Sequence, residues 1–305
     1  MKYSWCPEFC DKSPLFDPLR DVAKQLHEFE IWPGLEDYQR LLDSRLIPIK
    51  TRTGQPLRIV KKAAKPRNFS DHYAPRIYSR GEIQTRDQNW HDFFQLLTWI
   101  LFPKTKSLIN SLHIPHARKR MASGIDTGRR SLLENMLSLF DEGGAVIVSS
   151  DESLLSLIQE FKWKALFWRR RSELVSRLNC VVFGHALYEK ALSPYQGMTA
   201  NSILVKVDPA FFKRKCSDQL LEIDSLLEYY LDQGNIFNRP HDLSPFPLLG
   251  MPGWDKNNEH ENYYDNHSYF RSGRKAEGTT ISKRHILCSG ANLPEIQEFL
   301  HSKHN

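Results

Sequence analysis

The sequence predicts a mainly helical α+β fold, built as a single domain with a small sheet and a weakly attached C-terminal tail. Most long segments repeat apolar residues at helical spacing. Only three short runs are typical of strands, over residues 57–60, 145–148 and 202–207. From about residue 259 the chain becomes polar and rich in His and Asn. Helices that greatly outnumber short strands indicate the α+β class.

The domain organisation follows from length and composition. The 305 residues suffice for one large domain or two modest ones, and the chain has no internal repeat. We expect an N-terminal extension over residues 1–14 and a main domain over residues 15–272. A polar, basic tail with a short helix is expected over residues 273–305.

Capping residues and helix breakers bound the predicted helices. Asp17 followed by Pro18 opens the first helix, and Asp151 caps a later one. Phe102-Pro103 ends the most apolar helix, and Gly143-Gly144 turns the chain into a strand. These signals place helices over residues 17–30, 35–44, 90–101, 104–112, 131–140, 151–161, 164–178, 181–192, 217–231 and 293–301.

Three segments are expected to be irregular or extended. Residues 73–78 are predicted to be an extended approach to the next helix, and residues 115–128 an exposed basic connection. Residues 245–253 hold three prolines and two glycines, which is too many for a helix or a central strand. We expect this last segment to cover the core.

The helix over residues 90–101 combines a broad apolar face with a narrow polar stripe. At about 100° per residue, the stripe contains His91, Gln95 and Thr98, whereas Asp92 and Trp99 point elsewhere. A helix this apolar is buried on most sides, so its polar stripe must face a partner or a cavity. His91 and Gln95 are therefore candidate site residues.

Composition favours a cytoplasmic protein without a membrane anchor. Apolar residues make up 40% of the chain and charged residues 26%, as in ordinary soluble proteins. No run of apolar residues approaches the length of roughly 18 that is needed to cross a bilayer, and the N-terminus lacks an apolar signal core. The five cysteines are scattered along the sequence and are expected to be free thiols.

The net charge of +6 is concentrated in basic runs, which leave two interpretations open. One run lies within residues 50–67, a second is Arg169–Arg171, and a third lies within residues 271–284. Such runs are usually solvated faces, but they also suit the phosphate backbone of a nucleic acid. Binding of RNA or another anionic ligand is therefore one possible function.

His185 and Glu189 form the pair with the clearest chemical potential. They are four residues apart and so share one face of a helix. Such a pair can orient an imidazole, hold a divalent metal or act as a base, and it can equally just fix helix packing. With His91 they form a candidate metal set, and a divalent metal is the cofactor that these residue types suggest.

Two acids and two arginines extend this candidate site. Asp141 and Glu142 close a helix, where the helix dipole disfavours carboxylates. They are expected to pair with Arg76 or Arg86, to coordinate an ion, or simply to be exposed at a turn. Each arginine can be structural or can bind a carboxylate or phosphate of a ligand.

Several segments in order resemble the bacterial family catalogued as domain of unknown function 3025, and the likeness spans roughly residues 15–272. The segments are Trp90–Phe94, Phe102–Lys106, Leu139–Gly143, Phe183–Lys190, Thr199-Ala200, Pro247–Trp254, Tyr263-Tyr264 and Phe270-Arg271. The resemblance implies a shared fold and no particular reaction. Typical members carry Asn at the position of Gln95 and His at that of Asn201. If the family holds a metal through several histidines, Asn201 removes one of them here.

Three functions remain open at this stage. No Gly-rich phosphate loop, Gly-x-Ser-x-Gly elbow, His-Glu-x-x-His motif or dinucleotide fingerprint is present. The first function is a metal-assisted hydrolase-like or lyase-like enzyme, and the others are a nucleic-acid-binding protein and a non-catalytic interaction protein. The enzyme would use His91, His185, Glu189 and Asp141 in catalysis and Arg76, Arg86, Gln95 and Asn201 in substrate binding. It requires the His91 and His185 side chains to lie within about 10 Å of each other.

Overall fold

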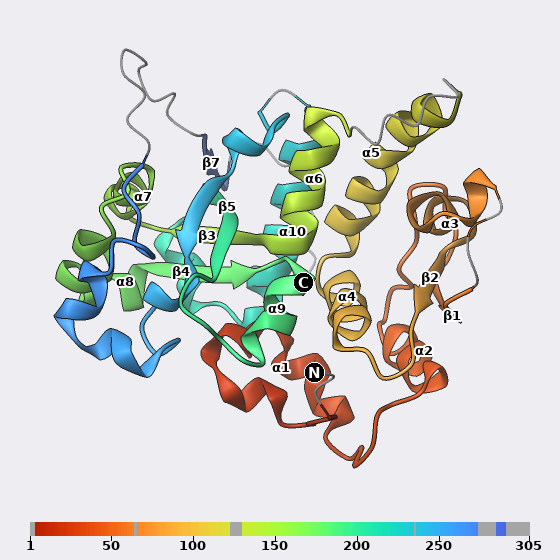
Figure 1. The fold of residues 1–305 in the computed structure, drawn as a ribbon, viewed down its shortest axis with the longest axis horizontal. Helices are drawn as coiled ribbons and strands as arrows, with labels where there is room; N and C mark the ends of the chain where they lie inside the picture. The colour runs from red at the N-terminus through yellow and green to blue at the C-terminus, as the bar shows by residue number, and fades with distance from the viewer. Residues whose placement is uncertain are drawn as a thin grey trace, which may run out of the picture.

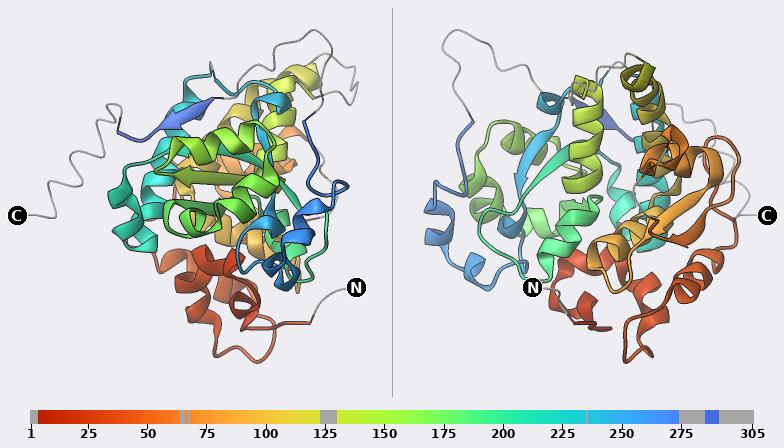
Figure 2. Two further views of the ribbon diagram at one scale, coloured as in Figure 1. Left: turned by 90° about the vertical axis from the view of Figure 1, so that its left-hand side faces the viewer. Right: turned by 45° about the vertical axis from the view of Figure 1, so that its right-hand side comes forward.

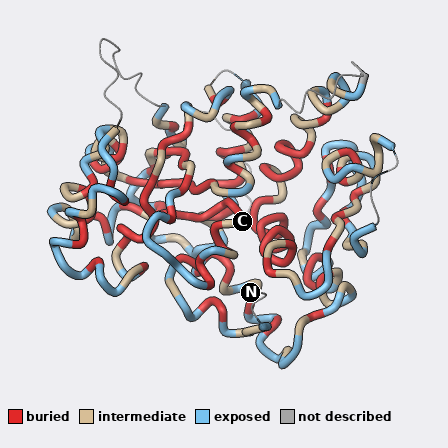
Figure 3. The backbone as a smooth tube through the Cα atoms, in the orientation of Figure 1, coloured by how far each residue is buried: buried red, intermediate tan, exposed pale blue. Residues whose placement is uncertain are grey.

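Five strands form a mixed sheet at the centre of the structure, with helices packed around it (Figures 1 and 2). The computed structural model describes residues 4–63, 66, 68–122, 130–234, 236–273 and 285–290. Over these residues the fold is the mainly helical α+β fold that the sequence predicts. Buried residues concentrate in the sheet and in the helices next to it (Figure 3).

The strand order of the sheet is β4 (Leu178–Val182), β3 (Gly144–Ser149), β5 (Thr199–Lys206) and β6 (Ser244–Pro247). A fifth strand, β7 (Ile286–Cys288), runs parallel to the end of β5. β3 is parallel to β5 and antiparallel to β4. All residues of β3 are buried, which is why a continuous apolar run predicts this strand.

A smaller sheet and several regular helices complete the fold. β1 (Arg58–Lys61) and β2 (Glu82–Thr85) pair in parallel. None of the helices in the described part of the chain is both long enough and apolar enough to span a membrane. The helices that agree with prediction are α2 (Leu35–Asp43), α4 (Trp90–Leu101), α6 (Leu132–Gly143), α7 (Glu152–Gln159) and α10 (Cys216–Asp232).

α4 is buried over its whole length except at His91. The N-terminal residues contribute to this burial, because Trp5 stacks on Trp90 with ring centroids 5.1 Å apart. Phe9 is fully buried and contacts Trp90 edge-on. The packed aromatic rings fix the position of α4, and His91 is left as its one partly accessible side chain.

In two places in the first half of the chain the structure is helical where the sequence predicted no helix. The segment expected to be extended over residues 73–78 is helical, as α3 (Tyr73–Arg80). Pro75 lies in its first turn, where the missing N–H is not needed. α5 (Pro103–Ala122) continues beyond the predicted end at residue 112, and it includes Pro115.

The predicted helix over residues 17–30 is instead a succession of short turns. A 3-10 helix (Pro14–Leu19) leads into α1 (Arg20–Ala23) and a second 3-10 turn (Lys24–Leu26). The cap is Ser13, whose hydroxyl accepts from the N–H of Leu15. Asp17 is not the cap, because its carboxylate binds Arg20.

The second half of the chain differs from prediction mainly where short strands occur. Residues 164–178 form a π-helical turn (Ala165–Arg169) and α8 (Arg171–Arg177), and the expected helix over 181–192 begins as β4 before α9 (His185–Ala191). Residues 245–253 begin in β6, at the sheet edge, where proline is tolerated. The remaining elements are 3-10 turns over Phe9–Lys12, Phe69–Asp71, Pro209–Lys213, Pro240–Asp242, Leu248–Gly250, Lys256–Glu259 and Glu261–Asp265. The helix expected over residues 293–301 lies outside the described residues.

Candidate metal centre

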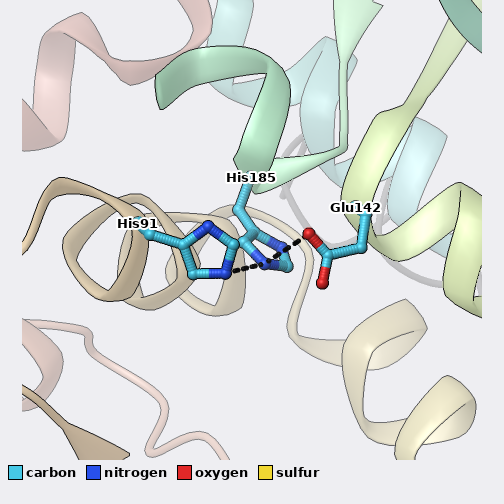
Figure 4. A group of neighbouring side chains, drawn as sticks. All are labelled: His91, Glu142 and His185. Atoms are coloured by element: carbon cyan, nitrogen blue, oxygen red, sulfur yellow. Dashed lines mark hydrogen bonds and ion pairs between the residues drawn. The ribbon is translucent and has the colours of Figure 1, made fainter. Parts of the chain in front are cut away.

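His91 and His185 meet between the first turns of two helices (Figure 4). The Nε2 atoms of the two rings lie 3.1 Å apart, and the ring centroids lie 4.5 Å apart at an interplanar angle of 78°. His185 is fully buried, whereas His91 is partly accessible. The two side chains are therefore close enough to share one site.

Glu142 approaches the same point from the end of α6 (Figure 4). Its Oε2 atom lies 3.5 Å from Nε2 of His185. One ligand atom from each of His91, Glu142 and His185 lies within 4.8 Å of the others. The Glu142 side chain is 54% exposed, so the cluster is open to solvent on this side.

Gly184 explains why α9 begins so close to the end of α6. The N–H groups of Phe183 and Gly184 both donate to the carbonyl of Gly144. A Cβ atom on Gly184 would lie 2.5 Å from the carbonyl oxygen of Glu142, which is too close for any side chain. Glycine at this position therefore lets the backbone before His185 lie directly against the backbone that carries Glu142.

Each histidine faces a carboxylate on the side away from the cluster. Oε2 of Glu189 lies 3.0 Å from Nδ1 of His91. Oδ2 of Asp141 lies 3.9 Å from Nδ1 of His185. A carboxylate favours a proton on the nitrogen that faces it. Both Nε2 atoms then present lone pairs to each other and to Glu142, an arrangement that a cation would stabilise.

Lys106 on α5 supplies a positive charge beside Asp141. Its ammonium lies 2.5 Å from Oδ1 of Asp141, and its side chain is only 4% exposed. Burial alone would raise the pKa of Asp141, but the Lys106 ammonium and the facing His185 lower it below its ordinary value. Asp141 is therefore an anion at neutral pH.

Burial sets the ionisation of the inner residues. It lowers the pKa of His185 to about 3, although Asp141 opposes the effect. Glu142 is half-exposed, yet its partial burial raises the pKa of its carboxyl group; His91 opposes this shift and the neighbouring Asp141 adds to it. His185 is therefore neutral at physiological pH, as a metal-binding imidazole must be.

The structure gives Glu189 and Asp141 partners other than those that we expected. Glu189 binds His91 rather than lying on the Nε2 side of the two rings, where Glu142 is found instead. The expectation that Asp141 pairs with Arg76 or Arg86 is wrong, because it pairs with Lys106.

The two arginines are held by other acids. Arg76 binds both Asp71 and Glu82 and is largely buried. Arg86 makes a two-pronged contact with Asp92, which also accepts from its backbone N–H.

Gln95 and Asn201 lie in the neighbourhood of the cluster without a role that geometry assigns. Gln95 is buried one helical turn after His91 on α4. Asn201 on β5 lies opposite Gly144, and its Nδ2 is 3.5 Å from the position of a Cβ on Gly143.

Lys106 is the residue that sequence reasoning missed. Its only signal is its place in the Phe102–Lys106 segment.

The basic runs are largely tied up in ion pairs where the structure describes them. Within the first run, Arg52 pairs with Glu228, Arg58 with Glu82, and Lys61 with Asp87. Within the second, Arg170 pairs with Asp151 and Glu173, and Arg171 with Glu259. This pairing favours a solvated, internally neutralised face.

A family model described as protein of unknown function (DUF3025) matches residues 57–274, a range that includes every residue of the cluster. The match covers most of the chain, and the chain belongs to this family. Comparison with curated proteins and with solved structures gave no match.

Proposed function

We propose that this member of the DUF3025 family is a metal-dependent hydrolase whose cation is held by His91, His185 and Glu142. One observation carries the proposal. Two buried or half-buried imidazoles turn their Nε2 atoms toward each other and toward a carboxylate, while their Nδ1 atoms face Glu189 and Asp141. Carboxylates behind metal-binding histidines are the usual means of fixing their tautomer and orientation.

Two of the three spacings between the ligand atoms match those around a small divalent cation. Around a tetrahedral zinc ion with bonds of about 2.0–2.1 Å, neighbouring ligand atoms are about 3.3 Å apart. The distances here are 3.1 Å between the two Nε2 atoms and 3.5 Å from Nε2 of His185 to Oε2 of Glu142. Three protein ligands with access to solvent are typical of catalytic rather than structural zinc sites.

A bound cation would supply the chemistry of hydrolysis, and the carboxylates behind the two histidines would orient its ligands. A divalent cation at this position would act as a Lewis acid toward water and the scissile group. Glu189 is 40% exposed and contacts Nδ1 of His91 through Oε2, so it would orient this ligand from the side away from the cluster. Asp141 holds a negative charge behind His185 and stabilises the ligand arrangement.

Substrate binding is assigned to four polar residues outside the cluster, of which Arg86 is the most clearly exposed. Arg86 uses Nε and Nη2 for Asp92 and is 45% exposed, so the other face of its guanidinium can bind a carboxylate or phosphate. Gln95 and Asn201 are proposed as neutral hydrogen-bonding groups. Arg76 contributes less directly, because both of its acidic partners lie within the protein.

Nucleic-acid binding is the weaker alternative, because acidic residues pair with Arg52, Arg58 and Lys61 of the first basic run and with Arg170 and Arg171 of the second. We propose a hydrolase of small anionic substrates in preference to an RNA-binding or purely interacting protein. A cytoplasmic location remains a prediction from the sequence.

The test is hydrolysis by protein that has been stripped with a chelator and reloaded with zinc. Nitrophenyl acetate, nitrophenyl phosphate and bis(nitrophenyl) phosphate serve as probes. We expect at least one to be hydrolysed only after reloading, and Glu142→Gln to abolish this turnover. Glu152→Gln is the matched control, since Glu152 is an exposed acid that pairs with Lys206.

Two results would contradict the hydrolase. One is zinc-loaded protein that hydrolyses none of the probes. The other is a preference for iron with uptake of oxygen, because two histidines and one carboxylate are also the ligands of non-haem iron oxygenases.

A further inference from the structure

We infer that Lys106 is a positioning residue, whose buried ammonium holds the Asp141 carboxylate toward Nδ1 of His185 and so keeps Nε2 of His185 directed at the cluster as a lone pair. This inference rests on the proposed metal site, on which Lys106 acts through Asp141. Lys106 itself touches neither the Nε2 atoms nor Glu142 in any contact that the structure describes.

The position of the Asp141 carboxylate is set by Lys106 more than by His185. Oδ1 lies 2.5 Å from the ammonium, whereas Oδ2 lies 3.9 Å from Nδ1 of His185. A contact of 2.5 Å is a short charge-assisted hydrogen bond, and one of 3.9 Å is an electrostatic attraction without a direct hydrogen bond. The stronger contact therefore determines where the weaker one can form.

Lys106 is itself held in place by its surroundings. Its ammonium lies 5.5 Å from the ring centroid of Trp99, which is buried. α5 is anchored at its start by Asp224, whose carboxylate accepts from the N–H groups of Lys104 and Thr105. A buried lysine without an anionic partner would be costly, so Lys106 and Asp141 constrain each other.

Loss of the ammonium would release the Asp141 carboxylate from its present orientation. The Asp141 side chain is 19% exposed, so it can turn toward water once its strongest partner is gone. The proton of His185 would then lose the attraction of this carboxylate and be held on Nδ1 less strongly. A population with the proton on Nε2 cannot bind a metal through that atom.

The experiment compares Lys106→Met with Lys104→Met. Lys104 lies on the same helix and is a half-exposed lysine near Glu228, so it controls for loss of a lysine from α5. Zinc affinity is measured by competition with a chelator. We expect Lys106→Met to weaken zinc binding by about 10- to 100-fold, as loss of an outer-sphere partner usually does, and Lys104→Met to leave it unchanged.

Two further measurements distinguish positioning from general support of the fold. Nitrogen-15 NMR of metal-free protein should show His185 with its proton on Nδ1 in the wild type and a mixture of tautomers in Lys106→Met. Asp141→Asn should lower zinc affinity to a similar extent, and the double variant should lose little more, because both substitutions break one chain of contacts. If Lys106→Met does not fold, Lys106→Gln, which keeps a donor, should give an intermediate loss.

The inference is overturned if Lys106→Met binds zinc as tightly as the wild type, or if His185 keeps its proton on Nδ1 in that variant. It is also overturned if the losses in the double variant simply add. Wild-type protein that binds no zinc would instead contradict the proposed function, and the tautomer measurement would still decide the role of Lys106.

Discussion

Neighbouring residues of α4 have opposite roles. Trp90 and Phe94 are buried among the aromatic rings that pack around α4, whereas His91 is partly accessible and contacts Glu189 and His185. Substitution of a large buried aromatic residue by alanine leaves a cavity. Loss of the His91 side chain instead leaves the half-exposed carboxylate of Glu189, which water can solvate.

We therefore predict that Trp90→Ala or Phe94→Ala lowers the free energy of unfolding by about 3–5 kcal/mol. His91→Ala should change it little and should abolish metal-dependent activity. Thermal and urea unfolding of the three variants checks this. A His91→Ala protein that melts as early as Trp90→Ala would show that the histidine is mainly structural.

Single-residue roles were only partly predictable from the sequence. The helical pattern singled out His91 because a polar residue on an apolar helix requires a partner, and the structure shows Glu189 and His185 in contact with it. The four-residue spacing of His185 and Glu189 predicted a contact within one helix, yet Glu189 binds His91, which is 98 residues away. Lys106 was missed because lysines in helices are normally solvated, and only the tertiary fold reveals that this one is buried.

At the scale of elements, the junction between α6, β3 and α9 determines the site. We predict that Gly184→Ala lowers stability by about 1–3 kcal/mol, since the new methyl group would overlap packed backbone. It should also weaken metal binding, because α9 must move away from Glu142.

The matched control for this substitution is Gly34→Ala. There a Cβ would meet only Asp37 Oδ2, at an ordinary 3.6 Å. Calorimetric unfolding and zinc titration of both variants test the prediction. Unchanged zinc affinity in Gly184→Ala would argue against the junction as the source of the site geometry.

The contact between Asp224 and the start of α5 makes the stability of the fold depend on pH. Burial raises the pKa of Asp224 from 3.8 to about 6, although hydrogen bonds from Thr105 and Lys104 oppose the shift. Between about pH 4 and 6 the folded state therefore keeps a proton that the unfolded state releases, so this group makes stability fall as the pH rises. Well above pH 6 both states are ionised, and the loss of about 3 kcal/mol is complete.

Asp224→Asn removes this titration and keeps an acceptor for one N–H group. We expect the stability of the wild type relative to the variant to fall by about 3 kcal/mol from pH 4 to pH 7. Urea unfolding at several pH values measures the difference. Parallel pH profiles for the two proteins would contradict the assignment.

Elements with their own periodicity and end signals were predictable, and elements defined by partners were not. α4, α7 and α10 each carry an apolar stripe, and α7 has its expected cap at Asp151. β2 and β4 are only four and five residues long. Such short strands gain their identity from the neighbouring strand, which no local pattern reveals.

At the scale of the whole molecule, the fold brings three distant segments to one point. His91 comes from α4, Glu142 from α6 and His185 from α9, while α5 carries Lys106 behind them. The aromatic packing around α4 and the backbone contact at Gly184 hold these elements together. We propose that this convergence binds a metal ion.

Metal analysis by mass spectrometry of the purified 305-residue chain tests whether this metal is bound. We predict a stoichiometric divalent metal in the wild type, lost in His91→Ala and in His185→Ala. Because His185 is fully buried, the more accessible His91 provides a variant that should keep its fold. A wild-type protein that holds no metal after exposure to zinc, iron and manganese would contradict the proposed metal site, as would equal metal content in folded His91→Ala.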